Sequence, residues 1–141
     1  MESVSNVGYS DGVRNILFLC YGNVYRSQWA EGFFSHFNKD TQYRAISAGR
    51  ITSVLTQDSI DLMSEREIDI HDNFSKQVTP EMIQGAYKIY DFTDYDLPLL
   101  PEEKLTRIVV KDPISEDIET QREIRDEIGE KVIKILEDIG Q

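Results

Sequence analysis

Short apolar runs recur along this chain and are separated by longer segments with a different spacing. The length and composition of these runs predict four strands, over residues 14–19, 43–47, 87–90 and 105–110. The first run contains four consecutive apolar residues, Ile16 to Leu19, which indicates a strand that is mostly buried. The sequence therefore supplies the strands of a sheet with a buried interior.

Apolar residues return at steps of three and four between and after these runs. The spacing predicts helices over residues 28–38 and 55–65, a short helix opened by Thr79-Pro80-Glu81, and a last helix from about residue 116. In the first helix, core packing is expected of Trp29, Phe33, Phe34 and Phe37. The last helix has a clear apolar face, formed by Ile124, Ile128, Val132, Ile135 and Ile139. Strands that alternate with helices predict an α/β fold of three layers, a four-stranded parallel sheet with helices on both faces.

The organisation of the chain is simple. Residues 1–13 show no hydrophobic period and are expected to form a flexible leader. Residues 14–141 contain no internal repeat, low-complexity tract or linker, so they are expected to form a single domain. A chain of 141 residues can bury a sizeable core without disulfides or metals.

The amino-acid composition limits the cellular compartment and the binding partners that are expected. The chain has one cysteine, which excludes an intrachain disulfide and fits a reducing compartment. No apolar stretch approaches the length of a signal sequence or membrane span, so a cytoplasmic protein without membrane contact is expected. A formal net charge of −11 opposes nonspecific binding to nucleic acid. One cysteine and two histidines show no metal-ligand spacing, and neither a metal nor another cofactor is expected.

The segment after the first predicted strand has the spacing of an anion-binding catalytic loop. It reads Cys20-Tyr21-Gly22-Asn23-Val24-Tyr25-Arg26-Ser27. The backbone N–H groups of this loop can surround a tetrahedral oxyanion while the Arg26 guanidinium closes the ring. Cys20 would attack the phosphorus as a thiolate stabilised by Arg26 and by the N-terminus of the following helix. The alternative interpretation is a buried core thiol followed by an ordinary turn.

Single residues of this loop have more than one interpretation. Gly22 and Asn23 suit the positive φ that a tight cradle demands, or they form an ordinary turn. Ser27 either donates a hydrogen bond to the Cys20 sulfur and helps it to leave, or caps the N-terminus of the helix. The two roles of Ser27 are compatible.

Phosphoester cleavage also needs a proton for the leaving oxygen, and Asp112 is the best candidate donor. It follows the fourth predicted strand, at the edge where ligands bind in parallel sheets. Pro113 restricts Asp112 to an extended backbone and would stiffen the loop that carries it. The alternative is that Asp112-Pro113 forms only a turn before the last helix.

Residues 20–27 and Asp112-Pro113 together resemble the low-molecular-weight protein tyrosine phosphatases, and the likeness extends over about residues 14–136. Ser47-Ala48-Gly49, after the second predicted strand, is similar to a second segment of that family. Residues 75–79 are similar to the segment that leads into the family's middle helix.

The resemblance implies a two-step phosphatase mechanism and a substrate class. Cys20 forms a phosphocysteine while Asp112 protonates the leaving phenolate, and Asp112 then activates the water that releases phosphate. Asn23, Ser27 and Ser47 are implied to support the loop. The implied substrate is a phosphotyrosine protein or a small aryl phosphate, and inorganic phosphate would be both product and inhibitor.

The chain departs from the family pattern at several positions. Tyr25 stands where the family often has a second cysteine, and Ile114 where an aromatic residue commonly follows Asp-Pro. Tyr21 is a candidate replacement for the missing aromatic wall. His71 and Asn73 compete for the place of a histidine that supports the loop, and the sequence does not choose between them.

Two other functions stay open. One is reduction of arsenate, which has the shape of phosphate; with Cys20 as the only cysteine, an external thiol would have to resolve the arseno-cysteine. The other is a non-catalytic phosphate-binding module, which would not need Asp112. The prediction that follows from the residues is a phosphatase.

Overall fold

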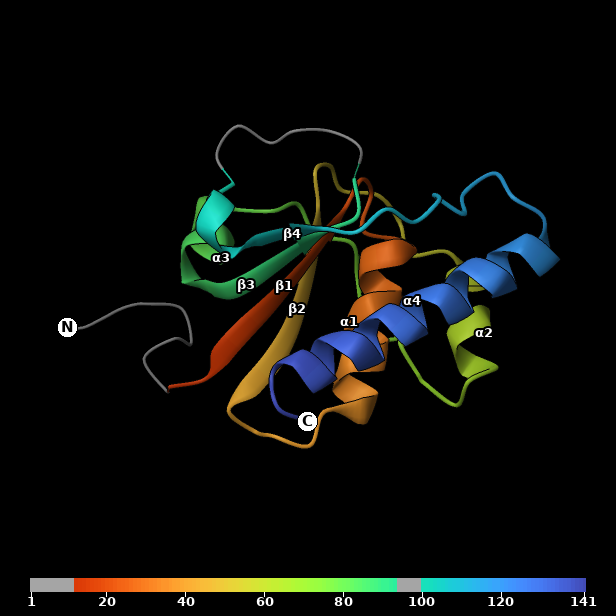
Figure 1. Cartoon of the computed structure of the whole chain (residues 1–141). Helices are drawn as coiled ribbons and strands as arrows, with labels where there is room; N and C mark the ends of the chain where they lie inside the picture. Colours follow the sequence, from red (N-terminus) through yellow and green to blue (C-terminus); the bar gives the residue numbers. More distant parts are fainter. Residues whose placement is uncertain (1–11, 94–99) are drawn as a thin grey trace.

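The computed structural model describes residues 12–93 and 100–141, so the expected leader lies almost entirely outside the described residues. Four parallel strands form one sheet in the order β2-β1-β3-β4 (Figure 1). Their bounds are Arg14–Cys20 for β1, Tyr43–Gly49 for β2, Ala86–Asp91 for β3 and Leu105–Arg107 for β4. The predicted α/β fold with a four-stranded parallel sheet is confirmed.

Strand β4 is shorter than the sequence predicts. Its three residues pair with the end of β3, where the last pair is Asp91 with Arg107. β3 ends at Asp91, so residues 108–110 have no strand to extend along and leave the sheet. Val109 is 85% exposed, which shows that the apolar run does not continue as a buried strand. The chain instead crosses the carboxyl edge of the sheet and carries Asp112 towards the first strand.

Four α-helices lie between and after the strands in the described parts of the chain. Their bounds are Arg26–Phe37 for α1, Gln57–Ser64 for α2, Pro80–Gly85 for α3 and Ile118–Asp138 for α4, with a short 3-10 helix at Glu102–Lys104. The side chains of Thr56, Thr79 and Asp117 accept hydrogen bonds from the first turns of α2, α3 and α4. Helix α1 differs, because its N-cap residue is Tyr25 and no side chain caps it. The interpretation of Ser27 as the cap is therefore wrong.

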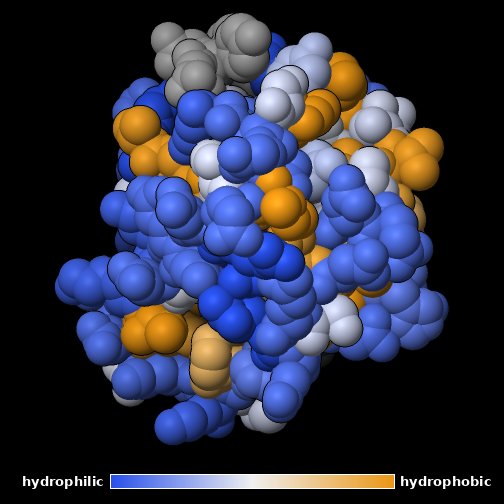
Figure 2. Space-filling view, turned by 90° about the vertical axis from the view of Figure 1, so that its right-hand side faces the viewer, coloured by the Kyte–Doolittle hydropathy of each residue, from blue (hydrophilic) through white to orange (hydrophobic). Residues whose placement is uncertain are grey.

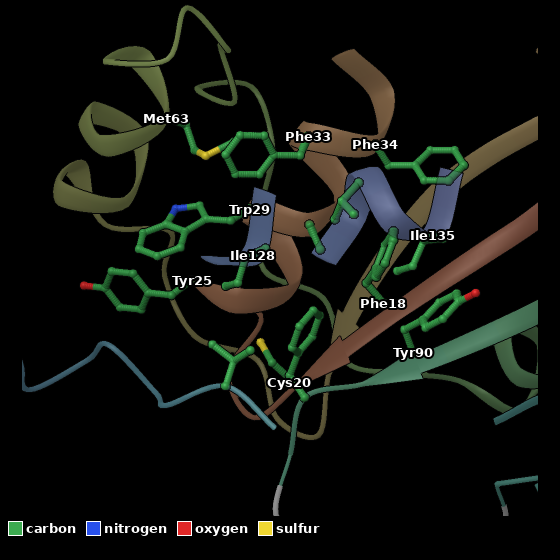
Figure 3. Close-up of a cluster of buried hydrophobic side chains, with 14 of the residues drawn as sticks. Phe18, Cys20, Tyr25, Trp29, Phe33, Phe34, Met63, Tyr90, Ile128 and Ile135 are labelled. Atoms are coloured by element: carbon green, nitrogen blue, oxygen red, sulfur yellow. The ribbon is translucent and has the colours of Figure 1, made fainter. Parts of the chain in front are cut away.

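The two faces of the sheet are covered unequally. Helices α1, α2 and α4 pack together over one face, while the short α3 lies against the other (Figure 1). Side chains alternate along β1, so Ile16 and Phe18 join the larger core and Leu17 and Leu19 the smaller one. Figure 3 shows Phe18 in the larger core among aromatic residues of α1 and isoleucines of α4. Both faces of β1 are thus buried, which accounts for its apolar run.

The apolar faces of the helices agree with the predicted core, with one exception. In α1, Trp29, Phe33 and Phe34 are buried as predicted. Phe37 is exposed, because it lies at the last residue of α1, and its ring stacks on Phe33 at the edge of the core. Within residues 12–93 and 100–141, no helix combines the length and the apolar character needed to cross a membrane.

Candidate active site

Cys20 lies at the carboxyl end of β1, where the chain turns into the loop that leads to α1. Its thiol is buried, and the sulfur lies 2.9 Å from Ser27 Oγ. A small cavity of about 110 Å³ opens above it. The three predicted catalytic side chains, Cys20, Arg26 and Asp112, all line this cavity. The fold thus brings a thiol, a guanidinium and a carboxyl group to one cavity.

The Arg26 side chain is held from behind by the protein backbone. Its Nη1 donates to the carbonyl oxygens of Phe92 at 2.6 Å and Val110 at 3.1 Å, while Nη2 lies 3.4 Å from Asp112 Oδ2. The guanidinium is buried and therefore positioned before any ligand arrives. Nη1 bonds the two carbonyls and Nη2 has a long contact with Asp112, and the guanidinium lines the cavity where an oxyanion would bind.

Asp112 differs from Arg26 in its exposure to solvent. Its side chain is 42% exposed, and Oδ1 accepts a hydrogen bond from the N–H of Ile114 at 3.1 Å. A carboxyl group at the mouth of a cavity can exchange its proton with water, as a general acid must. Gln121 of α4 donates to the carbonyl of Pro113 at 2.9 Å and ties this loop to the helix. The sequence analysis did not identify Gln121, because its role depends on how α4 packs.

Asn23 is the centre of a buried polar network beneath the loop. Its φ of 54° is left-handed, as expected, whereas Gly22 does not have a positive φ and that expectation is wrong. Asn23 Nδ2 donates to Ser27 Oγ at 2.7 Å and to Ser47 Oγ at 3.1 Å. Since Ser27 Oγ accepts from Asn23, its own proton is free to point at Cys20, the direction that a thiolate requires. The three predicted support residues therefore meet in one network.

The other atom of the Asn23 amide is bonded by Gln28, which also contacts one of the two candidates for loop support. Asn23 Oδ1 accepts from Gln28 Nε2 at 3.1 Å, and Gln28 Oε1 in turn accepts from Asn73 Nδ2 at 3.0 Å. Asn73 thus contacts the network, whereas His71 lies on the surface with its ring between Asp69 and Asp72. The hydrogen bond that the Asp69 carboxylate accepts from His71 Nδ1 raises the pKa of His71.

Glu31 of α1 is a part of this network that the sequence analysis missed. Its carboxylate accepts a hydrogen bond from Ser47 Oγ. Burial raises the pKa of Glu31, while the Ser47 hydrogen bond and the charge of Lys76 act in the opposite direction. Burial also lowers the pKa of Lys76, whose backbone N–H donates to Asn23 Oδ1.

Ser47-Ala48-Gly49 lies directly beside the loop, and Gly49 is paired with Cys20 in the sheet. A Cβ atom at position 49 would lie 2.7 Å from the carbonyl oxygen of Tyr21 and 2.8 Å from the nitrogen of Asn23. Backbone atoms cannot yield at such distances, so this position requires glycine. β2 therefore approaches the loop closely enough to hydrogen-bond with it.

Apolar side chains surround the mouth of the cavity. Tyr21, Ile51 and Ile114 line it and are exposed. Tyr21 is the aromatic member, and Ile51 and Ile114 are aliphatic. Apolar groups of this kind stand out on a surface that is otherwise mostly hydrophilic, as the face in Figure 2 illustrates. Among the described residues, no group of three or more His, Cys, Asp and Glu side chains is arranged to hold a metal ion.

Comparison with known proteins places this geometry in a family. The family model of the low molecular weight phosphotyrosine protein phosphatases matches residues 15–93. An arsenate reductase of Shouchella clausii (strain KSM-K16) is 33% identical over 133 residues, which cover 86% of this chain and 94% of that relative.

Two solved structures illustrate the likeness of the fold. An arsenate reductase in the phosphate binding state has a TM-score of 0.80 and 24% identity, covering 91% of this chain and 100% of that one. A low molecular weight protein tyrosine phosphatase from T. tengcongensis has a TM-score of 0.78 and 23% identity, covering 89% and 99%. At these identities the structures support the fold alone, while the family model and the curated relative support membership. The chain belongs to the low molecular weight phosphotyrosine protein phosphatase family.

Proposed function

We propose that the chain is a phosphatase that hydrolyses phosphotyrosine or other aryl phosphate monoesters through a phosphocysteine intermediate. The observation that carries this proposal is the cavity that Cys20, Arg26 and Asp112 line together, in a chain with a single cysteine. A nucleophile, a fixed cation and a solvent-accessible carboxyl group are the groups that cleavage of a phosphate ester requires.

The first step transfers the phosphoryl group to the enzyme. The backbone N–H groups of the loop and Arg26 bind the phosphoryl oxygens, and the Cys20 sulfur attacks phosphorus from below. The S–P bond forms while the bond to the aryl oxygen breaks, and Asp112 gives its proton to that oxygen. The leaving group departs as a neutral phenol.

The second step regenerates the thiolate. Asp112, now a carboxylate, takes a proton from a water molecule whose oxygen attacks phosphorus, and the S–P bond breaks. The Ser27 hydroxyl, 2.9 Å from the sulfur, stabilises the negative charge that returns to Cys20. Inorganic phosphate is the product, and it competes with substrate for the same cradle.

The side chains at the rim of the cavity indicate which class of substrate would fit. Tyr21, Ile51 and Ile114 present apolar surface around the phosphate position, which suits an aryl leaving group better than a polar one. Both a phosphotyrosine side chain and a small aryl phosphate meet this condition.

Arsenate reduction is the second candidate, and the names of the curated relatives favour it. The Cys20 sulfur would attack arsenate with loss of hydroxide, and an external thiol would then attack that sulfur. As the S–As bond breaks, its electron pair stays on arsenic, and arsenite leaves. A second thiol would then reduce the mixed disulfide between Cys20 and the first thiol, so that one arsenate consumes two thiols. The single cysteine weighs against this function, because no second thiol of the chain can resolve the adduct.

One set of assays distinguishes the two functions. Wild type, Cys20→Ser and Asp112→Asn are assayed with a series of aryl phosphates, and separately for arsenate loss with glutathione, thioredoxin and dithiothreitol. The phosphatase proposal predicts Cys20-dependent phosphate release that falls in Asp112→Asn. Thiol-dependent arsenate loss without release of phosphate from any aryl ester would contradict it and establish the second candidate.

A further inference from the structure

The carbonyl groups of the loop are bonded from outside the cavity. The N–H of Arg50 donates to the carbonyl oxygens of Cys20 at 3.2 Å and Tyr21 at 2.8 Å, and that of Ile51 also donates to Tyr21. These bonds come from the backbone that follows β2. Two further carbonyls are bonded by side chains instead, and both donors are serine hydroxyls from distant segments of the chain.

Ser75 and Ser59 supply these hydroxyls. Ser75 Oγ donates to the carbonyl oxygen of Gly22 at 2.8 Å, and Ser59 Oγ donates to that of Val24 at 2.6 Å. Ser75 belongs to the segment between α2 and α3, and Ser59 to the first turn of α2. Neither residue lines the cavity. They contact the opposite side of the backbone whose N–H groups would bind the anion.

The geometry of the peptide bond connects this outer contact to the inner surface. In a trans peptide the C=O of one residue and the N–H of the next point in opposite directions within one rigid plane. A hydroxyl that holds the Gly22 carbonyl on the outside therefore turns the Asn23 N–H towards the inside. By the same reasoning, Ser59 turns the Tyr25 N–H inward through the Val24 carbonyl.

We propose that Ser59 and Ser75 are positioning residues that preorganise the anion cradle by fixing two of its peptide planes. This inference rests on the proposed binding of a tetrahedral oxyanion in the loop, whether phosphate is turned over or only bound. If the backbone N–H groups of the loop are already oriented, no free energy is needed to reorient them when the anion or the transition state binds.

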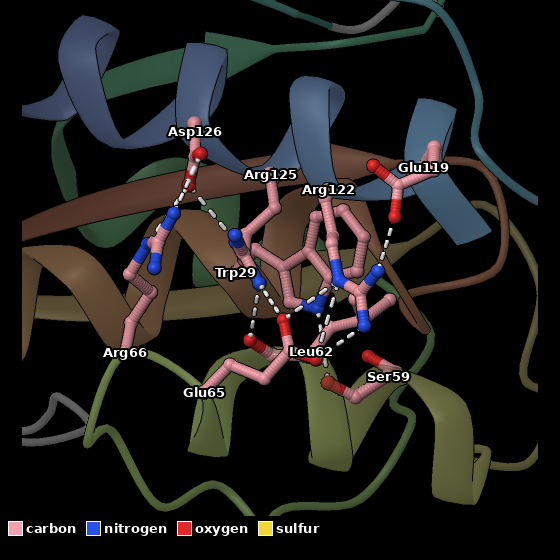
Figure 4. A network of polar contacts seen from close by, with 9 residues as sticks. All are labelled: Trp29, Ser59, Leu62, Glu65, Arg66, Glu119, Arg122, Arg125 and Asp126. Carbon is pink, nitrogen blue, oxygen red and sulfur yellow. Dashed lines mark hydrogen bonds and ion pairs between the residues drawn. The ribbon is translucent and has the colours of Figure 1, made fainter.

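Further hydrogen bonds hold Ser75 and Ser59 in place. Ser75 Oγ accepts a hydrogen bond from the N–H of Ser53 at 2.8 Å, which leaves its proton for the Gly22 carbonyl. Ser59 is fully buried, and its carbonyl accepts a hydrogen bond from Trp29 Nε1 at 3.2 Å (Figure 4). The main chain of Ser59 is therefore held against α1, and from this buried position its hydroxyl reaches the Val24 carbonyl.

A second contact from the same turn of α2 supports the assignment. Thr56, the N-cap residue of α2, donates from Oγ1 to the Tyr25 hydroxyl at 3.1 Å. The start of α2 thus contacts the loop through the backbone of Val24 and through the side chain of Tyr25. Helix α2 acts as the outer wall of the cradle.

The test measures phosphate binding and turnover in Ser59→Ala and Ser75→Ala. Binding of inorganic phosphate is followed by calorimetry, and kcat and KM are measured with an aryl phosphate. Each variant is expected to bind phosphate about 3- to 10-fold more weakly, as loss of one hydrogen bond predicts. A larger loss in kcat/KM is expected, because charge on the phosphoryl oxygens grows in the transition state.

Two controls separate positioning from stability. Ser75→Thr retains the hydroxyl and is expected to keep phosphate affinity near that of the wild type. Trp29→Phe removes the other bond between α1 and Ser59 but leaves the Val24 contact, so it is expected to lower Tm with little effect on phosphate binding. Ser75 is only partly buried, so Ser75→Ala remains informative if Ser59→Ala does not fold.

The outcomes are distinct from those of the proposed function. Wild-type phosphate affinity and kcat in both alanine variants, with or without a lower Tm, would overturn the positioning role. A wild type that binds phosphate but hydrolyses no aryl ester would refute the phosphatase proposal and would leave the binding test of Ser59 and Ser75 intact. Weaker phosphate binding in the alanine variants would then still support the inference.

Discussion

The polar network beneath the loop and the polar network between α2 and α4 differ in burial and charge. The first consists of Asn23, Ser27 and Ser47, which are fully buried and uncharged, and Glu31 at its margin. The second consists of charged side chains, most of which are partly exposed, and is shown in Figure 4. The first network lies against the Cys20 sulfur, and the second joins α2 to α4 away from it.

The charged network fastens α4 to the end of α2. Arg125 is 1% exposed and donates to the carbonyl oxygen of Leu62 at 3.0 Å and to the Glu65 carboxylate. Arg122 also donates to Glu65, and its hydrogen bonds and those of Arg125 lower the pKa of Glu65 to about 2. Asp126 accepts from Arg125 and from Arg66, which extends the network over the surface.

The difference follows from what each network has to do. Neutral hydrogen bonds are directional and can be buried completely at a modest cost, so they can fix the positions of atoms close to the sulfur. Ion pairs are costly to bury and are screened where they are exposed. They suit an interface that must hold two helices together but does not require exact atomic positions. We therefore expect changes in the first network to alter catalysis, and changes in the second to alter stability.

The largest expected effect is that of Cys20→Ser. The variant should lose aryl phosphate turnover, because a hydroxyl is a poor nucleophile in this site, while Arg26 and the N–H cradle still bind phosphate. Initial rates and phosphate calorimetry measure the two properties. Turnover near that of the wild type would refute the covalent mechanism.

Asp112→Asn should have the next largest effect, and its size should depend on the leaving group. We expect a loss of about 10²- to 10⁴-fold with phenols of high pKa, and a much smaller loss with activated phenols that leave without a proton. The measurement is kcat/KM across a graded series of aryl phosphates. Equal losses over the whole series would assign Asp112 a structural role.

Substitutions of Asn23 should separate the effect of backbone strain from the effect of losing the side-chain hydrogen bonds. Asn23→Ala leaves the Ser27 and Ser47 hydroxyls without their donor and strains a residue with a φ of 54°. Asn23→Gly loses the same hydrogen bonds without that strain. Both should lower kcat by about 10- to 100-fold, as is usual for groups that orient a catalytic residue.

Unfolding temperatures complete this test, because only Asn23→Ala should suffer the additional strain. We expect its Tm to lie below that of Asn23→Gly, while the two kcat values remain similar. A kcat in Asn23→Gly equal to that of the wild type would show that the side-chain network does not act on Cys20.

The smallest effect on activity is expected for Glu65→Gln, which breaks the charged network. The pKa of Glu65 is lowered from 4.5 to about 2 in the folded protein, so its carboxylate stabilises the fold above pH 4.5 and loses this contribution as the pH falls towards 2. The variant should lose on the order of 1 kcal/mol near neutral pH, because Glu65 and Arg122 are partly exposed and the buried Arg125 keeps Asp126 and the Leu62 carbonyl as partners. Its kcat should stay within twofold of the wild type, within experimental scatter.

Thermal denaturation from pH 7 to pH 2 measures this difference. The gap in Tm between wild type and Glu65→Gln should narrow below pH 4.5, because protonation then removes the charge from the wild type as well. Glu130→Gln, at an exposed position of α4, is the matched control and should show no such gap. A constant gap at all pH values would mean that the Glu65 charge does not stabilise the fold.

The loop and the sheet were predictable because their signals are local. Cys20 to Ser27 are contiguous, so the spacing of their residue types is itself the geometry of the loop. The periods of apolar residues likewise reflect burial on one face of a helix or on both faces of a strand, and they gave the order of the elements. Asp112 lies at the cavity as the sequence predicts, although the apolar run that precedes it leaves the sheet after Arg107.

What surrounds the loop was decided only by the tertiary structure. Ser59, Ser75, Glu31 and Gln121 are ordinary polar residues in their local sequence, and each gains its role from a partner that lies far along the chain or on a packed neighbour. The choice of Asn73 also depended on the position of Gln28 in the folded chain. Hydrogen bonds of this kind depend on distances that core packing sets, and hydrophobic periodicity carries no information about them.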